Sequence, residues 1–247
     1  MKFQKYMAVG ILGLTMALGF SGCQSENQKN QDAYRKIGIN SMAEGDYDKA
    51  VKSFQKALDT SLGKIGAEEI DICYYKAAAQ FAKKDYDGAI ETYTSLIDYD
   101  KENANAYYLR GSVYLDTDKK DKAFKDYKNA VKYAGREYEI YEGIYENLTN
   151  KGETEEAKNY LKKALDIKPK DGADYAEQGH VYYLLEDYTQ AKSSLDRAID
   201  KDDKTALLYL AEVYNATDQQ EQGQALLESY VKENAKDSEA LNTLGMM

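Results

Sequence analysis

Apolar residues recur at intervals of three and four positions from Gln31 to the end of the chain. Such spacing places them on one side of an α-helix, so it predicts a series of amphipathic helices rather than strands. The single proline among 247 residues agrees with this, because proline interrupts helical backbone hydrogen bonds. The pattern therefore predicts an all-α protein.

The helical pattern also repeats over a longer distance. Three segments, GDYDKAVKSFQKAL from Gly45, KDYDGAIETYTSLI from Lys84 and EDYTQAKSSLDRAI from Glu186, share a tyrosine followed three residues later by alanine. Aligning the chain on that alanine marks six positions, separated by 39, 34, 34, 34 and 32 residues: Ala50, Ala89, Ala123, Ala157, Ala191 and Gly223. Regular periods of this length are typical of stacked helical repeats.

The 34-residue period resembles the tetratricopeptide repeat, a pair of antiparallel helices. The eighth place of that repeat is usually small, and here only the fourth residue is large: Gly38, Ala77, Gly111, Tyr145, Gly179 and Ala211. The resemblance implies a superhelical array over residues 31–247. Its units are expected at 31–64, 70–103, 104–137, 138–171, 172–203 and 204–237, with a capping helix at 238–247.

Short polar residues mark the expected helix ends. Gly45, Gly135 and Gly152 stand where a left-handed residue would end a helix. Acidic residues that follow such ends suit the N-cap of the next helix: Asp46, Asp85 and Asp187. Five extra residues within 60–69 predict a longer loop between the first two units, and two fewer residues predict a tightened turn between the fifth and sixth. In unit four, Tyr145 in the small place predicts a local shift in packing.

The first thirty residues are interpreted as an export signal and a tether. Lys2 and Lys5 precede an uncharged apolar run at 7–20, which is short for a membrane span. The run ends in Phe-Ser-Gly-Cys, which resembles the bacterial lipobox and implies cleavage before a lipidated Cys23. We therefore expect a lipoprotein signal peptide at 1–22, a flexible polar tether at 23–30, and a protein anchored to the extracytoplasmic face of a bacterial membrane. A plainly cleaved signal and an uncleaved anchor are the alternatives.

The formal net charge of -10 disfavours nucleic acid as a partner, because phosphates repel an acidic chain. By resemblance to the repeat family, the first helix of each unit lines a groove that holds a peptide. The expected groove residues are aromatic or small in units two and three, acidic in unit four and aromatic in unit five: Tyr74, Tyr108, Ser112, Glu139, Glu142, Glu146, His180 and Tyr183. Such a groove suits a guest with basic and apolar side chains, although a plain solvated surface is the alternative.

Local motifs for chemistry are absent from the sequence. His180, the only histidine, has no nucleophile beside it in the sequence and is interpreted as a ligand contact or a solvated residue, one turn from Glu177. The acidic runs lack the offsets of a calcium loop, and no zinc or phosphate-binding pattern occurs, so no metal site and no cofactor are predicted. Cys73 occupies a packing place on a helix.

The sequence thus predicts a protein-binding or peptide-binding scaffold of the cell envelope and not an enzyme. A surface that binds glycans or small ligands through stacked tyrosines is the alternative function.

Overall fold

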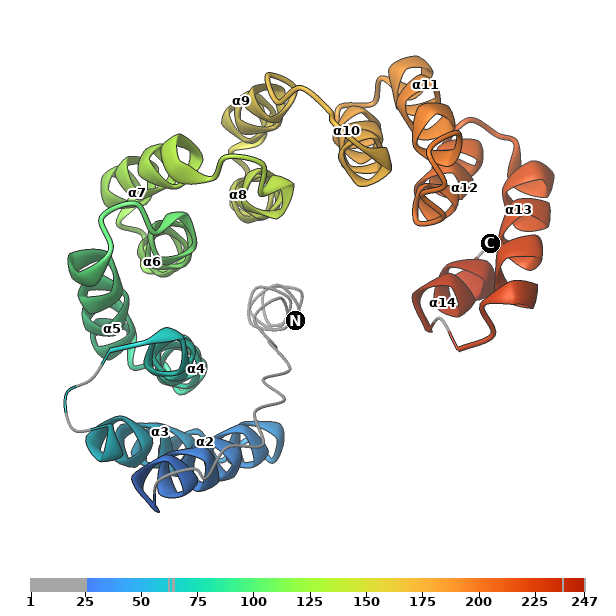
Figure 1. Ribbon diagram of the computed structural model, residues 1–247. Helices are drawn as coiled ribbons and strands as arrows, with labels where there is room; N and C mark the ends of the chain where they lie inside the picture. Colours follow the sequence, from blue (N-terminus) through green and yellow to red (C-terminus); the bar gives the residue numbers. More distant parts are fainter. Residues whose placement is uncertain (1–25, 62, 64, 237, 247) are drawn as a thin grey trace. The chain divides into compact units, whose positions relative to one another are not determined.

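The computed structural model describes residues 26–61, 63, 65–236 and 238–246. These residues form thirteen α-helices and no strand (Figure 1). The chain divides into two compact units, Met1–Gly135 and Arg136–Met247, which are described separately below. Cys23 and the proposed signal peptide lie outside the described residues. Among the helices that are described, none has the length and apolar character needed to cross a membrane.

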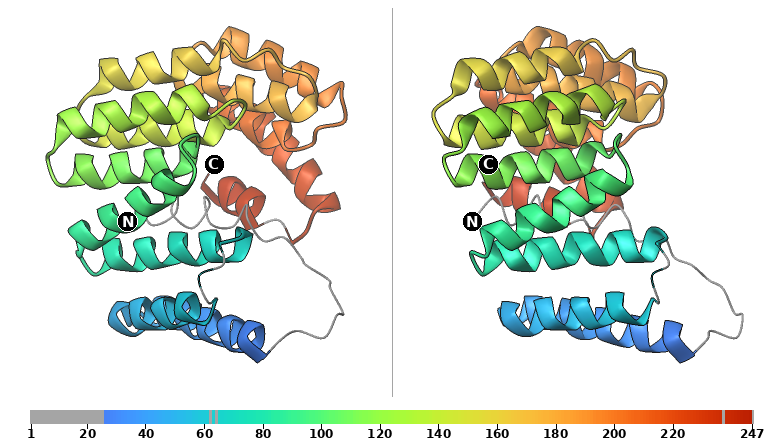
Figure 2. Two further views of the ribbon diagram at one scale, coloured as in Figure 1. Left: turned by 60° about the vertical axis from the view of Figure 1, so that its left-hand side comes forward. Right: turned by 90° about the vertical axis from the view of Figure 1, so that its left-hand side faces the viewer.

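The first unit contains three helix pairs. Their bounds are α2 Glu26–Ala43, α3 Tyr47–Thr60, α4 Ala67–Ala82, α5 Tyr86–Tyr99, α6 Ala104–Asp116 and α7 Lys120–Tyr133. The two members of a pair lie side by side, as α2 and α3 do in both views of Figure 2. All-helical architecture built from such pairs confirms the predicted fold class.

The second unit contains three further pairs and a last single helix. Their bounds are α8 Tyr138–Asn150, α9 Thr154–Ala164, α10 Gly172–Leu184, α11 Tyr188–Ile199, α12 Ala206–Ala216, α13 Gln220–Glu233 and α14 Ser238–Met246. Every pair in both units falls within, or starts shortly before, one of the 34-residue sequence repeats.

The turn inside each pair has the same design. Three residues separate the two helices in all six pairs, and the middle one has a positive φ between 56° and 80°. The six middle residues are Gly45, Lys84, Asp118, Gly152, Glu186 and Asp218. This backbone region suits glycine, yet only two of the six are glycine, so the packed helices impose the turn on whatever residue stands there.

The last turn residue caps the second helix in three of the pairs. The Asp46 carboxylate accepts a hydrogen bond from the Lys49 amide, and aspartates cap in the same way at two equivalent places, Asp85 and Asp187. This confirms the predicted caps. The other three places hold residues whose side chains do not cap: Lys119, Glu153 and Gln219.

Small residues at the eighth place bring the helices of a pair together. A Cβ built on Gly179 would lie 2.6 Å from Leu195 Cγ, and one built on Gly111 would lie 2.9 Å from the Tyr127 ring. Leu195 and Tyr127 are fully buried. The missing Cβ therefore provides the space that the large residue of the second helix fills.

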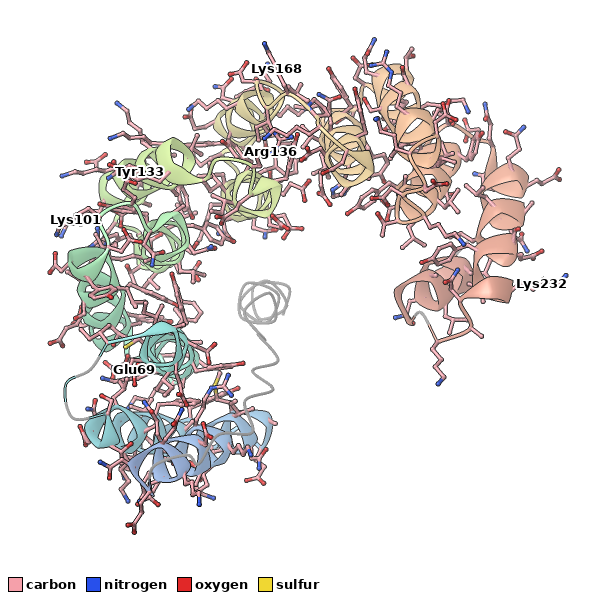
Figure 3. All side chains as sticks on the ribbon, in the orientation of Figure 1. Glu69, Lys101, Tyr133, Arg136, Lys168 and Lys232 are labelled. Atoms are coloured by element: carbon pink, nitrogen blue, oxygen red, sulfur yellow. The ribbon has the colours of Figure 1, made fainter. Side chains whose placement is uncertain are left out.

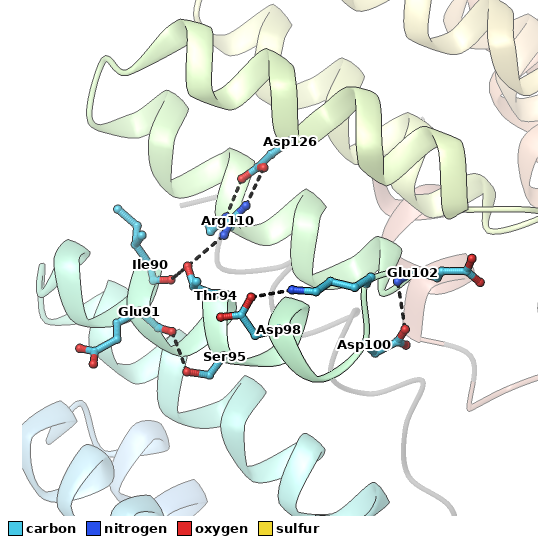
Figure 4. A network of polar contacts seen from close by, with 10 residues as sticks. Ile90, Glu91, Thr94, Ser95, Asp98, Asp100, Glu102, Arg110 and Asp126 are labelled. Carbon is cyan, nitrogen blue, oxygen red and sulfur yellow. Dashed lines mark hydrogen bonds and ion pairs between the residues drawn. The ribbon is translucent and has the colours of Figure 1, made fainter.

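A buried ion pair ties three helices of the first unit together (Figure 4). Arg110 on α6 donates from Nε to one Asp126 oxygen at 2.7 Å and from a terminal nitrogen to the other at 2.8 Å. A second terminal nitrogen donates to the Thr94 hydroxyl on α5 at 2.9 Å. The side chains of Arg110 and Asp126 are 15% and 4% exposed. Burial alone would lower the pKa of Arg110, but the Asp126 carboxylate raises it.

Two details differ from the sequence predictions. Helix α2 begins at Glu26, so the last five residues of the predicted tether at 23–30 are helical. Their side chains are exposed, so this part of the helix needs no periodic apolar residues. Glu, Gln and Lys favour a helix by their intrinsic propensity, which an apolar pattern does not reveal.

The predicted tightened turn between units five and six is also wrong. Residues 200–205 join α11 to α12, whereas four residues, 100–103, join α5 to α6. The missing residues shorten the helices instead: α11 and α12 have 12 and 11 residues, against 14 and 13 in α5 and α6. At the first joint, α3 ends at Thr60 and α4 begins at Ala67, and part of the extra length lies in α4, which has 16 residues against 13 in α6.

Candidate functional site

The candidate site lies in the second unit, on the first helices of its pairs. Its central residue is His180 on α10, whose Nδ1 lies 2.9 Å from Glu142 Oε1 on α8. The two side chains are 19% and 13% exposed. Both were predicted for the groove, and the structure places them in direct contact. The interpretation of His180 as a solvated residue is therefore wrong, because its ring is largely buried against an acid.

A second contact explains why these side chains meet. Arg136, labelled in Figure 3, donates a hydrogen bond to Asp174 near the start of α10 and another to the Lys168 carbonyl at 2.8 Å. Arg136 and Asp174 are 38 residues apart, as are Glu142 and His180. Equal offsets mean that α8 and α10 run parallel in a fixed register, which sets Glu142 opposite His180.

A second acidic residue, Glu177, joins the pair of Glu142 and His180. It precedes His180 by three residues on α10, a spacing that puts both side chains on one helix face. One donor atom from each of Glu142, Glu177 and His180 can be chosen so that all three lie within 4.8 Å of one another. The three residues are called the acid–histidine cluster below.

The protonation of the cluster departs from ordinary values. Burial alone would lower the pKa of His180, but the Glu142 carboxylate, which is close and hydrogen-bonded, raises it to about 9. Burial and then the Glu142 charge raise the pKa of Glu177 to about 8, although His180 opposes this. At neutral pH the imidazole is therefore charged, and Glu177 retains its proton because burial, and then the nearby Glu142 charge, disfavour its ionised form.

Aromatic rings hold the imidazole in place. The Tyr209 ring on α12 stacks on the His180 ring with centroids 4.3 Å apart and planes at 10°. Tyr183 lies on the same helix as His180, with a centroid distance of 6.1 Å. Glu212 on α12 adds another negative charge that acts on His180 and Tyr183. The site thus combines tyrosine rings with carboxylates from three first helices.

The remaining predicted groove residues divide between the two units. In α8, Glu139 is exposed and Glu146 is half-buried. In the first unit, by contrast, Tyr74, Tyr108 and Ser112 are only 6%, 7% and 1% exposed. The Tyr74 hydroxyl donates to Asn103 at 2.7 Å, and Ser112 bonds the Tyr108 carbonyl within its own helix. These three side chains serve the packing of their unit and present little surface to a guest.

Sequence reasoning missed two features of the site. Tyr209 stands at the sixth place of its repeat and was not assigned to the groove, and Glu177, at the sixth place of the preceding repeat, was noted only for its proximity to His180. An acid or aromatic residue at the sixth place of successive repeats is the signal that would have found them. Metal-binding motifs that can be recognised in a sequence have short spacings, whereas Glu142 and His180 are 38 residues apart.

Cys73 offers less chemistry. Its thiol is half-buried on α4, and burial raises its pKa, so it is mainly protonated at neutral pH.

Comparison with known proteins agrees with this architecture. A curated relative, anaphase-promoting complex subunit 3 of Schizosaccharomyces pombe, is 21% identical over 217 residues. The match covers 76% of this chain and 33% of the relative, so the chain spans about a third of that protein's length.

Solved structures that are similar to this chain include two from bacteria. A tetratricopeptide repeat protein from Parabacteroides merdae is 14% identical with a TM-score of 0.51, covering 97% of this chain and 91% of that one. The pilF protein of Pseudomonas aeruginosa is 15% identical with a TM-score of 0.46, covering 90% and 100%. At these identities, the first likeness concerns the fold alone.

Family models match in several places. A model described as TPR repeat matches residues 77–118, and models described as tetratricopeptide repeat match residues 32–61, 104–136, 146–171 and 177–238. Because these matches together extend over most of the described chain, the protein belongs to the tetratricopeptide repeat family.

Proposed function

We propose that this protein is an extracytoplasmic, lipid-anchored scaffold that binds protein segments carrying basic and apolar side chains. The binding surface is the face of the second unit formed by α8, α10 and α12. The observation that carries the proposal is the excess negative charge at that surface, where the Glu142 and Glu212 carboxylates outnumber the single histidine beside two tyrosine rings.

The chemistry of this surface suits a cationic guest. A lysine or arginine side chain would neutralise carboxylates that at present raise the pKa of their neighbours. Tyrosine faces provide wide apolar contact area and attract cations. Carboxylates at the edge of this binding surface mainly speed the association of a basic partner and disfavour acidic partners.

The proposal is tested by titrating a fluorescent peptide of alternating lysine and leucine against the purified chain, with EDTA present. We expect binding that weakens as salt is raised, and at least tenfold weaker binding after Glu142→Gln combined with Glu212→Gln. Glu155→Gln combined with Glu156→Gln, both at exposed positions of α9, also removes two negative charges; this charge-matched control should leave the affinity unchanged. Equal binding of a glutamate–leucine peptide would overturn the proposal.

The anchor is tested separately. Growth with a clickable palmitate analogue should label the wild-type protein and not Cys23→Ser, and mass spectrometry should find a mature chain that begins at Cys23. A mature chain beginning elsewhere would favour a plainly cleaved signal, and an unlabelled full-length chain would favour an uncleaved anchor. Either result would refute lipid anchoring.

A glycan-binding surface, the alternative function, has less support in the first unit. Sugar stacking requires open ring faces, whereas Tyr74 and Tyr108 are buried.

A further inference from the structure

The acid–histidine cluster has the composition and placement of a metal site. Glu177 and His180 form a Glu-x-x-His pair on one face of α10, and Glu142 faces them from α8. A Glu-x-x-His pair completed by a glutamate from another helix is a ligand set that helical proteins use for first-row transition metals. We propose that Glu142, Glu177 and His180 bind one divalent transition-metal ion of the zinc class.

The distances allow such an ion with small side-chain movements. Bonds of about 2.1 Å in a tetrahedral site place donor atoms about 3.4 Å apart. The His180 Nδ1 and Glu142 Oε1 atoms, now 2.9 Å apart, would separate slightly. The other donor pairs are at most 4.8 Å apart and would close by about 1.4 Å or less. Rotations of the glutamate side chains supply movements of this size without moving the helices.

The charges also match. Two carboxylates and a neutral imidazole bring a charge of −2, which one divalent ion cancels. The ion displaces two protons, the one that His180 now shares with Glu142 and the one on Glu177, so the net charge of the cluster is unchanged. The Glu177 side chain is half-buried beside the negative charge of Glu142, so a cation bound between the two would offset their repulsion. Three protein ligands leave the fourth position of a tetrahedral ion for water or for a guest carboxylate.

The surroundings favour a transition metal over calcium or magnesium. Hard cations prefer all-oxygen sites, whereas an imidazole nitrogen suits zinc, cobalt, nickel and copper. Stacking by Tyr209 restricts the imidazole plane, a role that outer groups commonly play around metal-bound histidines.

The test uses the full chain without a polyhistidine tag, titrated with Zn²⁺ and with Co²⁺ in the absence of peptide. We expect one ion per chain, bound at micromolar affinity or better, visible d–d absorption of the Co²⁺ form, and no comparable binding of Ca²⁺ or Mg²⁺. His180→Gln and Glu177→Gln should each weaken Zn²⁺ binding at least a hundredfold.

Glu139→Gln is the matched control. Glu139 lies on α8 one turn before Glu142, and its charge acts on Glu177, but it is exposed and stands outside the donor set. It should weaken Zn²⁺ binding less than threefold. An effect of Glu139→Gln equal to that of Glu177→Gln would show general charge attraction and overturn the site.

A direct measurement remains decisive if a variant fails to fold. The chain contains one histidine, so its imidazole gives a single set of NMR signals. Saturating Zn²⁺ should shift those signals, because the metal binds the imidazole nitrogen directly. Unchanged imidazole signals would refute the proposal, while leaving peptide binding in EDTA, and hence the proposed scaffold function, unaffected.

Discussion

Arg110 binds both carboxylate oxygens of Asp126 across the α6–α7 pair, and the same guanidinium reaches Thr94 on α5. Because Asp126 is almost fully buried, its removal would leave an unpaired charge inside the unit. We expect Asp126→Ala to lower the free energy of unfolding by about 3 kcal/mol. Urea denaturation followed by circular dichroism measures this.

The double variant Arg110→Met with Asp126→Leu is the informative comparison. It removes both charges and keeps volume, so it should lose less stability than Asp126→Ala alone. A double variant less stable than the single one would show that the ion pair itself is a net source of stability.

The small place opposite Leu195 gives a second prediction. Gly179→Ala adds a Cβ that would lie 2.6 Å from Leu195 Cγ and 3.2 Å from the Ala191 carbonyl oxygen. Alanine gains about 1 kcal/mol of helix propensity over glycine, while overpacking costs about 1–3 kcal/mol, so a net loss of about 1 kcal/mol is expected. Combined with Leu195→Ala, the loss should be smaller than the sum of the two single changes, which a double-mutant cycle would reveal.

A third prediction concerns Lys119, the N-cap residue of α7, whose side chain does not cap the helix. Its neighbours at the equivalent places, Asp46 and Asp85, accept a hydrogen bond from the third amide of their helices, and Lys119 has no acceptor to offer. Lys119→Asp should therefore add about 1 kcal/mol to the stability of the first unit. The change loses only an exposed contact with Asp87 at 4.0 Å. A thermal midpoint that falls instead would show that the α7 start differs from those of α3 and α5.

Glu68 gives a pH dependence. Burial and then a hydrogen bond with Asp32 raise its pKa from 4.5 to about 7, with Arg35 opposing. The folded chain thus holds this proton more tightly than the unfolded chain, so its contribution to stability is present below pH 4.5 and is lost as pH rises to about 7. With allowance for solvent screening, the loss is on the order of 1 kcal/mol.

Glu68→Gln should remove that dependence. In EDTA, its unfolding free energy should match the wild type near pH 4.5 and exceed it at pH 8. Glu91→Gln, at an exposed position of α5, should keep the wild-type profile. A wild-type profile that rises between these pH values after subtraction of the Glu68→Gln profile would contradict the assignment.

The sequence predicted those features that depend on residues near one another in the chain. The aspartate caps and glycine helix ends follow from residue type at a fixed offset, and the helix pairs follow from apolar spacing. Contacts between successive repeats were not predictable in the same way. The pairing of Glu142 with His180 depends on how α8 and α10 are aligned. The contact of Tyr209 with His180 depends on which way the side chain of the sixth residue in a repeat points. The burial of Tyr74 and Tyr108 likewise depends on neighbouring helices.

The uniform three-residue turns have a kinetic consequence. Each second helix folds back on the helix just before it, so the contacts within a pair link residues close in sequence. Low contact order favours rapid folding, and each pair can begin to form before later pairs exist. For the exported chain proposed above, formation of the amino-terminal pairs before the later ones shortens the time that apolar faces are open to aggregation.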